Sequence, residues 1–254
     1  MLKGLVTGLL LLLLVPGVSA AVEVELSGVI AALETPFKEQ TKKSERIADF
    51  SADFSQESHI ASIDRTQHGQ GVVQFKFETA AVQKSPQAKF RWQYQEPNVQ
   101  EIISDGQMMW VYLPENRQVI ESDISQIDAQ QGENPVTFLS GLGNLSRDFS
   151  ISWGVPRIVA TGGYLLQLEP RKKSQFIQKI EIVVSEKAVN TWLKKNKTGE
   201  IFPILSTLVT DPNGNRTAIK FREVRVNQKL SDKLFTFDRP EGVEVVDPAE
   251  QMSF

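Results

Sequence analysis

The sequence predicts a mainly β protein of about eleven strands, with one N-terminal helix and one short central helix. Apolar and polar residues alternate with a period of two in many short segments, most clearly between Phe90 and Ile120. Turn-forming residues such as Pro97-Asn98 and Ser104-Asp105-Gly106 separate these segments. Helical periodicity is confined to two places. A chain of 254 residues with this pattern is compatible with a single all-β domain.

The first twenty residues have the pattern of a secretory signal peptide. Lys3 precedes an unbroken apolar run from Leu9 to Val15, and Val18-Ser19-Ala20 supplies small residues before a cleavage site after Ala20. A membrane anchor is the alternative, but the run is shorter than the ~20 apolar residues of a transmembrane helix. We therefore expect an exported domain over residues 21–254.

The composition indicates a soluble globular domain. Apolar residues make up 41% of the chain and charged residues 23%. The absence of cysteine excludes a disulfide framework and a lipid attachment site, so we expect a soluble protein instead of a lipid-anchored one. The net charge of −3 becomes −4 once Lys3 is removed, and no basic stripe suggests a nucleic-acid partner.

Two segments have helical patterns. The first has an apolar face made of Leu26, Val29, Ile30, Leu33 and Phe37, and Pro36 should end or kink it. The second starts at Asn134-Pro135, a capping residue followed by proline at the first helical position. Its apolar residues are Val136, Phe138, Leu139 and Leu142. Gly141 and Gly143 predict that this helix is short and mobile.

The sequence has few residues or motifs that could support catalysis or metal binding. The two histidines, His59 and His68, stand among polar neighbours, and no nucleophile elbow, phosphate-binding glycine loop or zinc motif is present. The segment from Asp211 to Asn215 has glycine at the wrong position for a calcium loop and fits a hairpin turn. A pair of catalytic carboxylates is not excluded, but no pair stands out. We expect no enzymatic activity, no metal and no cofactor.

Large aromatic side chains on a sheet that lacks catalytic motifs suggest either a dry core or a hydrophobic binding cavity. Phe90, Trp92 and Tyr94 alternate with polar residues, and Trp110 and Tyr112 share one face of the segment Met108–Leu113. Composition alone favours the dry core. An open or flattened barrel covered by helices would instead enclose a pocket for an apolar ligand.

The ordered set of motifs is similar to one known family. The segment from Phe90 to Val119, with its F-R-W-Q-Y start and its S-D-G turn, closely resembles the periplasmic outer-membrane lipoprotein carriers of the LolA type. Ala52 to Gln56, Gly69-Gln70-Gly71 and the close from Phe235 to Val243 resemble further motifs of this family in the same order.

The resemblance implies a single-domain, incomplete (half-open) antiparallel β-barrel with helices as a lid. Family members shield the acyl chains of lipoproteins released by an inner-membrane ABC transporter and deliver them to an acceptor lipoprotein of the outer membrane. We therefore expect a monomeric, chaperone-like periplasmic carrier. A periplasmic sensor domain of the same fold, which binds stray lipoproteins and signals stress, is the alternative.

Alternation combined with the resemblance assigns two groups of site residues. The acyl-chain cavity is expected to contain Phe75, Phe77, Phe90, Trp92, Tyr94, Ile102, Trp110 and Tyr112. The lid helix is expected to contribute Val136, Phe138, Leu139 and Leu142, to fill the empty pocket and to move aside on loading. Many family members hold the lid with an arginine directly before a proline. Here that place reads Lys84-Ser85-Pro86, and Arg91, the nearest arginine, alternates away from Trp92.

Overall fold

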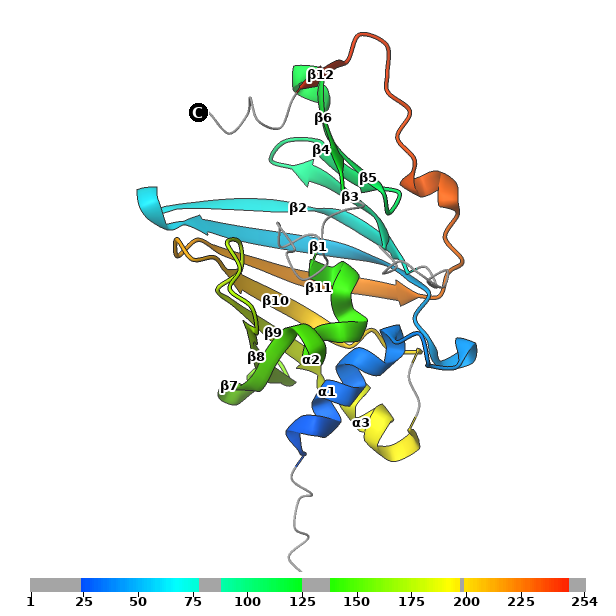
Figure 1. Ribbon diagram of the computed structural model, residues 1–254, viewed down its shortest axis with the longest axis vertical. Helices are drawn as coiled ribbons and strands as arrows, with labels where there is room; N and C mark the ends of the chain where they lie inside the picture. The colour runs from blue at the N-terminus through cyan, green and yellow to red at the C-terminus, as the bar shows by residue number, and fades with distance from the viewer. Residues whose placement is uncertain (1–23, 78–87, 125–137, 197–198, 247–254) are drawn as a thin grey trace, which may run out of the picture.

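The computed structural model describes residues 24–77, 88–124, 138–196 and 199–246. Twelve strands in these residues form one sheet in the order β12-β6-β5-β4-β3-β2-β1-β11-β10-β9-β8-β7 (Figure 1). The strands are β1 Asp49–Ile60, β2 Arg65–Lys76, β3 Lys89–Glu96, β4 Gln100–Ser104, β5 Met108–Leu113, β6 Gln118–Asp123, β7 Phe149–Val159, β8 Gly163–Pro170, β9 Lys179–Ser185, β10 Ile204–Thr210, β11 Arg216–Val226 and β12 Glu244–Val246.

The sheet is open, with β12 and β7 at its two edges, and every neighbouring pair is antiparallel except β12 and β6. This confirms the predicted half-open antiparallel architecture, with twelve strands in the described residues instead of about eleven. The additional strand, β12, has only three residues and pairs in parallel with β6. Such a short segment has no alternation from which the sequence could predict it.

The helices are short, and none in the described residues is long and apolar enough to cross a membrane. They are α1 Leu26–Glu34, α2 Leu145–Asp148 and α3 Glu186–Lys195, with 3-10 helices η1 Thr35–Phe37, η2 Lys43–Glu45, η3 Ala61–Ile63, η4 Pro114–Asn116, η6 Phe138–Asn144 and η7 Asp232–Phe235. As predicted, α1 ends beside Pro36, which lies in η1. The helices α1, α2 and α3 lie on one side of the sheet (Figure 1).

The two faces of the sheet carry different residues because side chains alternate along each strand. On β1, Phe50, Ala52 and Phe54 are buried, whereas Asp53 is exposed. The face that carries Phe54, here called the inner face, continues through its register partner Phe221 on β11. The buried cluster of the inner face extends from β4 to β7 in the order of the sheet and includes residues of α1 and η6. The opposite side of the sheet is called the outer face.

Two predicted local features are visible in the described residues. Asp211 Oδ1 accepts hydrogen bonds from the backbone amides of Asn213 and Asn215, at 2.8 and 2.9 Å, so this segment is the hairpin turn between β10 and β11. The central helix was expected from residue 135. The structure describes it from Phe138, as the 3-10 helix η6 followed by the single turn of α2.

Candidate functional site: the aromatic inner face

The inner face of β1, β2 and β3 is lined by stacked aromatic rings. The Phe50 and Phe75 rings lie 5.2 Å apart and nearly parallel, and Phe90 lies 5.4 Å from Phe75. Trp92 packs edge-on against Phe54 at 4.8 Å. All five side chains are at most 1% exposed. The structure therefore brings the predicted residues Phe75, Phe90 and Trp92 together in one apolar layer.

Three further predicted residues border this layer. The ring centroids of Phe77 and Phe37 of η1 lie 4.9 Å apart. Ile102 of β4 is buried and is the register partner of Trp92 on the neighbouring strand β3. The Tyr94 ring lies 5.0 Å from Phe54, and its hydroxyl donates to Gln56 Oε1 at 2.8 Å. Burial raises the pKa of Tyr94, so this hydroxyl keeps its proton at any physiological pH.

Trp110 and Tyr112 do not share this face, and the prediction that grouped them with Trp92 is corrected by the strand register. Trp110 of β5 pairs with Ile103 of β4, and Ile103 in turn pairs with Arg91 of β3. Arg91 is adjacent to Trp92 in β3, so its side chain points to the opposite face of the sheet from Trp92. Trp110 therefore lies on the same face as Arg91. The inner face of β5 carries Val111, which pairs with Ile102. Periodicity predicts which residues of a strand share a face, but it does not align one strand with the next.

The outer face of β3 to β6 has its own apolar cover. The Phe237 ring lies 6.2 Å from Trp110 and 5.4 Å from Tyr112, and Phe235 of η7 is fully buried. Ile103 and Val119 are also fully buried and do not belong to the cluster of the inner face. The segment from Leu230 to Phe237, here called the outer cover, therefore shields the aromatic side chains of this face.

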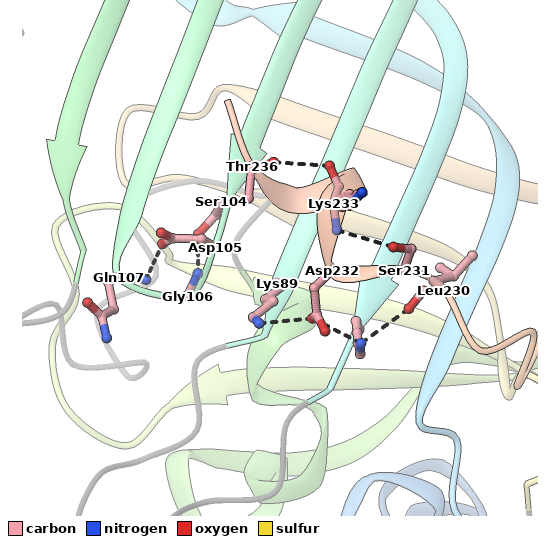
Figure 2. Close-up of polar contacts among 11 residues, drawn as sticks. Lys89, Ser104, Asp105, Gly106, Gln107, Leu230, Ser231, Asp232, Lys233 and Thr236 are labelled. Atoms are coloured by element: carbon pink, nitrogen blue, oxygen red, sulfur yellow. Dashed lines mark hydrogen bonds and ion pairs between the residues drawn. The ribbon is translucent and has the colours of Figure 1, made fainter. Parts of the chain in front are cut away.

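Polar contacts hold the outer cover in place. Asp232 Oδ1 accepts from Lys76 Nζ at 2.9 Å and from Lys89 Nζ at 3.0 Å (Figure 2). These hydrogen bonds lower the pKa of Asp232 below its ordinary value of 3.8. The Arg91 guanidinium donates to the Leu234 carbonyl at 3.1 Å and pairs with Glu101. Arg91 thus binds the outer cover and is not placed to hold a lid on the inner face.

The predicted lid residues Phe138, Leu139 and Leu142 belong to η6 and are buried in the cluster of the inner face. Val136, the fourth predicted lid residue, lies outside the described residues. A Cβ atom on Gly143 would come within 2.8 Å of the Phe37 carbonyl oxygen, so glycine permits the close approach of η6 to η1. Both the lid and the N-terminal helix thus cover the same apolar face.

A buried carboxylate connects α1 to the end of the lid. Glu34, the last residue of α1, is 1% exposed. It accepts hydrogen bonds from the Ser146 backbone amide and, at 3.0 Å, from the Ser146 hydroxyl, and it pairs with Lys38 Nζ at 2.8 Å. Removal of this buried carboxylate would leave these partners unpaired. We call this group the Glu34 latch.

Sequence reasoning missed the latch and one helix. Glu34 follows directly on Leu33 of the apolar face of α1, and Lys38 is four residues later, which is a signal of a helical ion pair. The contact with Ser146 spans 112 residues and has no sequence signal. For Trp192 the sequence left burial and a place on an interaction surface as alternatives; the residue lies in α3 and is partly buried against the core cluster.

In the described part of the chain, no group of three or more His, Asp or Glu residues is arranged to bind a metal ion. The inner face is an apolar surface with a small number of hydrogen-bonding groups.

Comparison with known proteins identifies the family. The family model described as "Outer membrane lipoprotein carrier protein LolA" matches residues 45–238, which is most of the chain. The chain belongs to the LolA family. This is a family of carriers and not of enzymes, which confirms the prediction of a non-enzymatic protein.

Relatives of this LolA-family chain share modest sequence identity with it. An outer-membrane lipoprotein carrier protein of Pseudomonas paraeruginosa is 30% identical over 62% of this chain, and the match spans 65% of that relative's length. The outer-membrane lipoprotein carrier protein of Hahella chejuensis is 27% identical, and the match covers 75% of this chain and 82% of the relative. That of Chromohalobacter salexigens is 24% identical, and the match covers 86% of this chain and 93% of the relative. A solved LolA superfamily protein of Nitrosomonas europaea covers 85% of this chain and 99% of its own, at 15% identity and a TM-score of 0.41.

Proposed function

We propose that this protein carries the acyl chains of outer-membrane lipoproteins across the periplasm. In this role it accepts them from an inner-membrane ABC transporter and releases them to an acceptor lipoprotein of the outer membrane. Its membership of the LolA family supports this proposal, as does the signal-peptide pattern that ends at Ala20. The observation that carries it is the aromatic inner face beneath a short, glycine-containing lid.

The physical requirement for such a carrier is to keep acyl chains out of water. Each methylene group removed from water contributes about 0.8 kcal/mol, so a lipid anchor does not leave a membrane without an apolar surface to receive it. The inner face presents this surface on β1, β2 and β3. In the structure it is filled by neighbouring side chains, including Leu139 and Leu142 of the lid. Loading therefore requires the lid to move.

The lid is suited to movement because its backbone is a short 3-10 helix that contains two glycines. A 3-10 helix of seven residues with two glycines has weak internal stability. Its burial depends on three apolar side chains, and its end is attached through the Glu34 latch. An acyl chain that replaces Phe138, Leu139 and Leu142 against the aromatic rings would conserve apolar burial while the lid is displaced. Uptake and release then cost little net free energy.

A release assay tests this function. Spheroplasts that contain a newly made acylated lipoprotein are incubated with the purified chain from residue 21 onward. We expect the lipoprotein to appear in the soluble fraction in an equimolar complex with this protein. A lipoprotein without its acyl chains should form no complex. If the acylated lipoprotein stays in the membrane at every protein concentration, the carrier function is wrong.

A further inference from the structure

One end of the inner face is polar and hollow. A pocket of about 520 Å³ lies at the end of the β1–β2 hairpin, and its lining comes from β1, β2, β3, β4, β11 and the β3–β4 turn. Residues of the inner face in this lining include Gln56, Gly69, Tyr94, Ile102 and Thr217. None of the lining residues belongs to α1, η6 or α3. The pocket is therefore not part of the region covered by the lid.

The polar groups along this end form a continuous row of hydrogen bonds. The Tyr94 hydroxyl donates to Gln56 Oε1 at 2.8 Å, and Gln56 Nε2 donates to Ser58 Oγ at 3.0 Å. Ser58 Oγ lies 3.3 Å from Thr217 Oγ1. A Cβ atom on Gly69 would lie 3.2 Å from the Tyr94 ring, so glycine leaves room for the ring on this face. We call Tyr94, Gln56, Ser58 and Thr217 the polar row.

The polar row continues the aromatic layer without a break. On β1, Phe50 and Phe54 precede Gln56 and Ser58 on the same face, and on β3 Trp92 precedes Tyr94. Trp92 stands at the boundary, and its indole Nε1 is buried with no hydrogen-bond partner among the residues that the structure describes. The face thus changes from purely apolar to hydrogen-bonding along one direction.

The chemistry of the pocket favours a neutral polar group. Amide and hydroxyl groups of the polar row both donate and accept. The charged side chains in the lining include both signs, Arg65 and Glu96, and Glu96 accepts from Gln70 at 2.9 Å. A phosphate or carboxylate would need an excess of cationic donors. Ester and amide groups need donors and acceptors without net charge.

We propose that this pocket binds the glyceryl ester and adjoining amide groups of the lipid anchor, while the acyl chains extend along the aromatic layer towards the lid. The proposal rests on the carrier function and adds the orientation of the ligand. The tails lie under η6, and the polar end of the anchor lies at the β1–β2 hairpin. The attached polypeptide would leave the protein from this open end.

Two ligands separate the polar pocket from the apolar layer. Monomyristoylglycerol carries a glyceryl ester, and the fluorescent probe N-phenylnaphthylamine carries neither an ester nor a glycerol. Their affinities are measured for the chain from residue 21 onward and for the variants Gln56→Leu and Tyr94→Phe. Gln93→Leu is the matched control, because Gln93 is adjacent to Tyr94 and points to the outer face.

Gln56→Leu should weaken monomyristoylglycerol binding about five-fold, which corresponds to one hydrogen bond of ~1 kcal/mol. The affinity for N-phenylnaphthylamine should change less than two-fold, and Gln93→Leu should change neither affinity. If the affinity for monomyristoylglycerol is unchanged in both Gln56→Leu and Tyr94→Phe, the proposal that the pocket binds the glyceryl ester is wrong. Failure of the unmodified chain to bind either ligand overturns the carrier function itself.

A second measurement needs no substitution and therefore does not depend on the folding of a variant. Backbone amide signals of the unmodified chain are followed by NMR during titration with monomyristoylglycerol. The largest shifts should include Gly69 and Gln56, and N-phenylnaphthylamine should leave these two signals nearly unmoved. Shifts confined to residues of the lid and of the aromatic layer would contradict the proposed orientation.

Discussion

The two faces of the β3–β5 region are both apolar, but they are covered in different ways. The inner face meets the short helix η6, which contributes three apolar side chains and is attached by the Glu34 latch. The outer face meets the outer cover, which buries Phe235 and is bound by Asp232 and by the carbonyl of Leu234. A short, glycine-containing lid over the inner face is suited to a surface that exchanges a ligand. The ionic and backbone contacts that hold the outer cover are suited to a permanent structural contact on the outer face.

This difference shows why an aromatic residue in a strand does not by itself mark a binding site. Trp92 and Trp110 occupy strands β3 and β5, which both have an alternating pattern and are separated in the sheet by β4. Trp92 is fully buried on the inner face, whereas Trp110 is partly buried beneath Phe237 on the outer face. Only the element that covers each residue distinguishes a candidate ligand surface from a structural contact.

The largest expected effect comes from Trp92→Ala. This substitution removes a fully buried ring from the aromatic layer and should lower the free energy of unfolding by about 3–5 kcal/mol. Trp110→Ala removes a ring that is only partly buried and should cost only about 1–2 kcal/mol. Urea unfolding of both variants measures the difference. Equal losses would show that the two faces contribute equally to stability.

Phe235→Ala tests whether the outer cover is only structural. The loss of this buried ring should also lower the free energy of unfolding by about 3–5 kcal/mol. Because Phe235 lies on the outer face, binding of N-phenylnaphthylamine at a temperature where the variant is folded should stay within two-fold of the unmodified protein. A large change in probe affinity would place acyl binding on the outer face.

Glu34→Gln tests the latch. The substitution removes the ion pair with Lys38 and weakens the bonds to Ser146, and it should lower the free energy of unfolding by about 1–3 kcal/mol. Since a weaker latch makes the lid easier to displace, the affinity for N-phenylnaphthylamine should rise several-fold. Glu115→Gln, at an exposed position in η4, is the control and should change neither quantity. Unchanged probe affinity in Glu34→Gln would mean that the latch does not hold the lid.

The smallest effect is expected from the pH dependence of the outer cover. Asp232 has a pKa below 3.8 in the folded protein, because Lys76 and Lys89 donate to its ionised form. Its contribution to stability is present above that pH and is lost as the pH falls through the lowered pKa. Asp232→Asn should therefore reduce the acid dependence of unfolding below about pH 4. An identical pH profile for the variant would mean that the two ion pairs do not contribute to stability.

The sequence predicted the strands well because alternation is a local property. Phe50 and Phe54, or Phe90 and Trp92, are buried as their spacing indicates. The sequence did not predict the outward position of Trp110, because the face of each strand depends on the turn that precedes it. It also left α3 without an assignment, although Ser185 accepts a capping bond from the Ala188 amide at 3.4 Å. Contacts between distant residues, such as Glu34 with Ser146, required the structure.

Quenching by a brominated acyl chain tests the central claim most directly. The chain has four tryptophans, and two variants are prepared that each retain only Trp92 or only Trp110, with phenylalanine at the other three positions. Bromine quenches indole fluorescence only at close range. Loading with a brominated monoacylglycerol should quench Trp92 strongly and leave Trp110 nearly unchanged. Equal quenching of both residues, or stronger quenching of Trp110, would contradict acyl binding on the inner face.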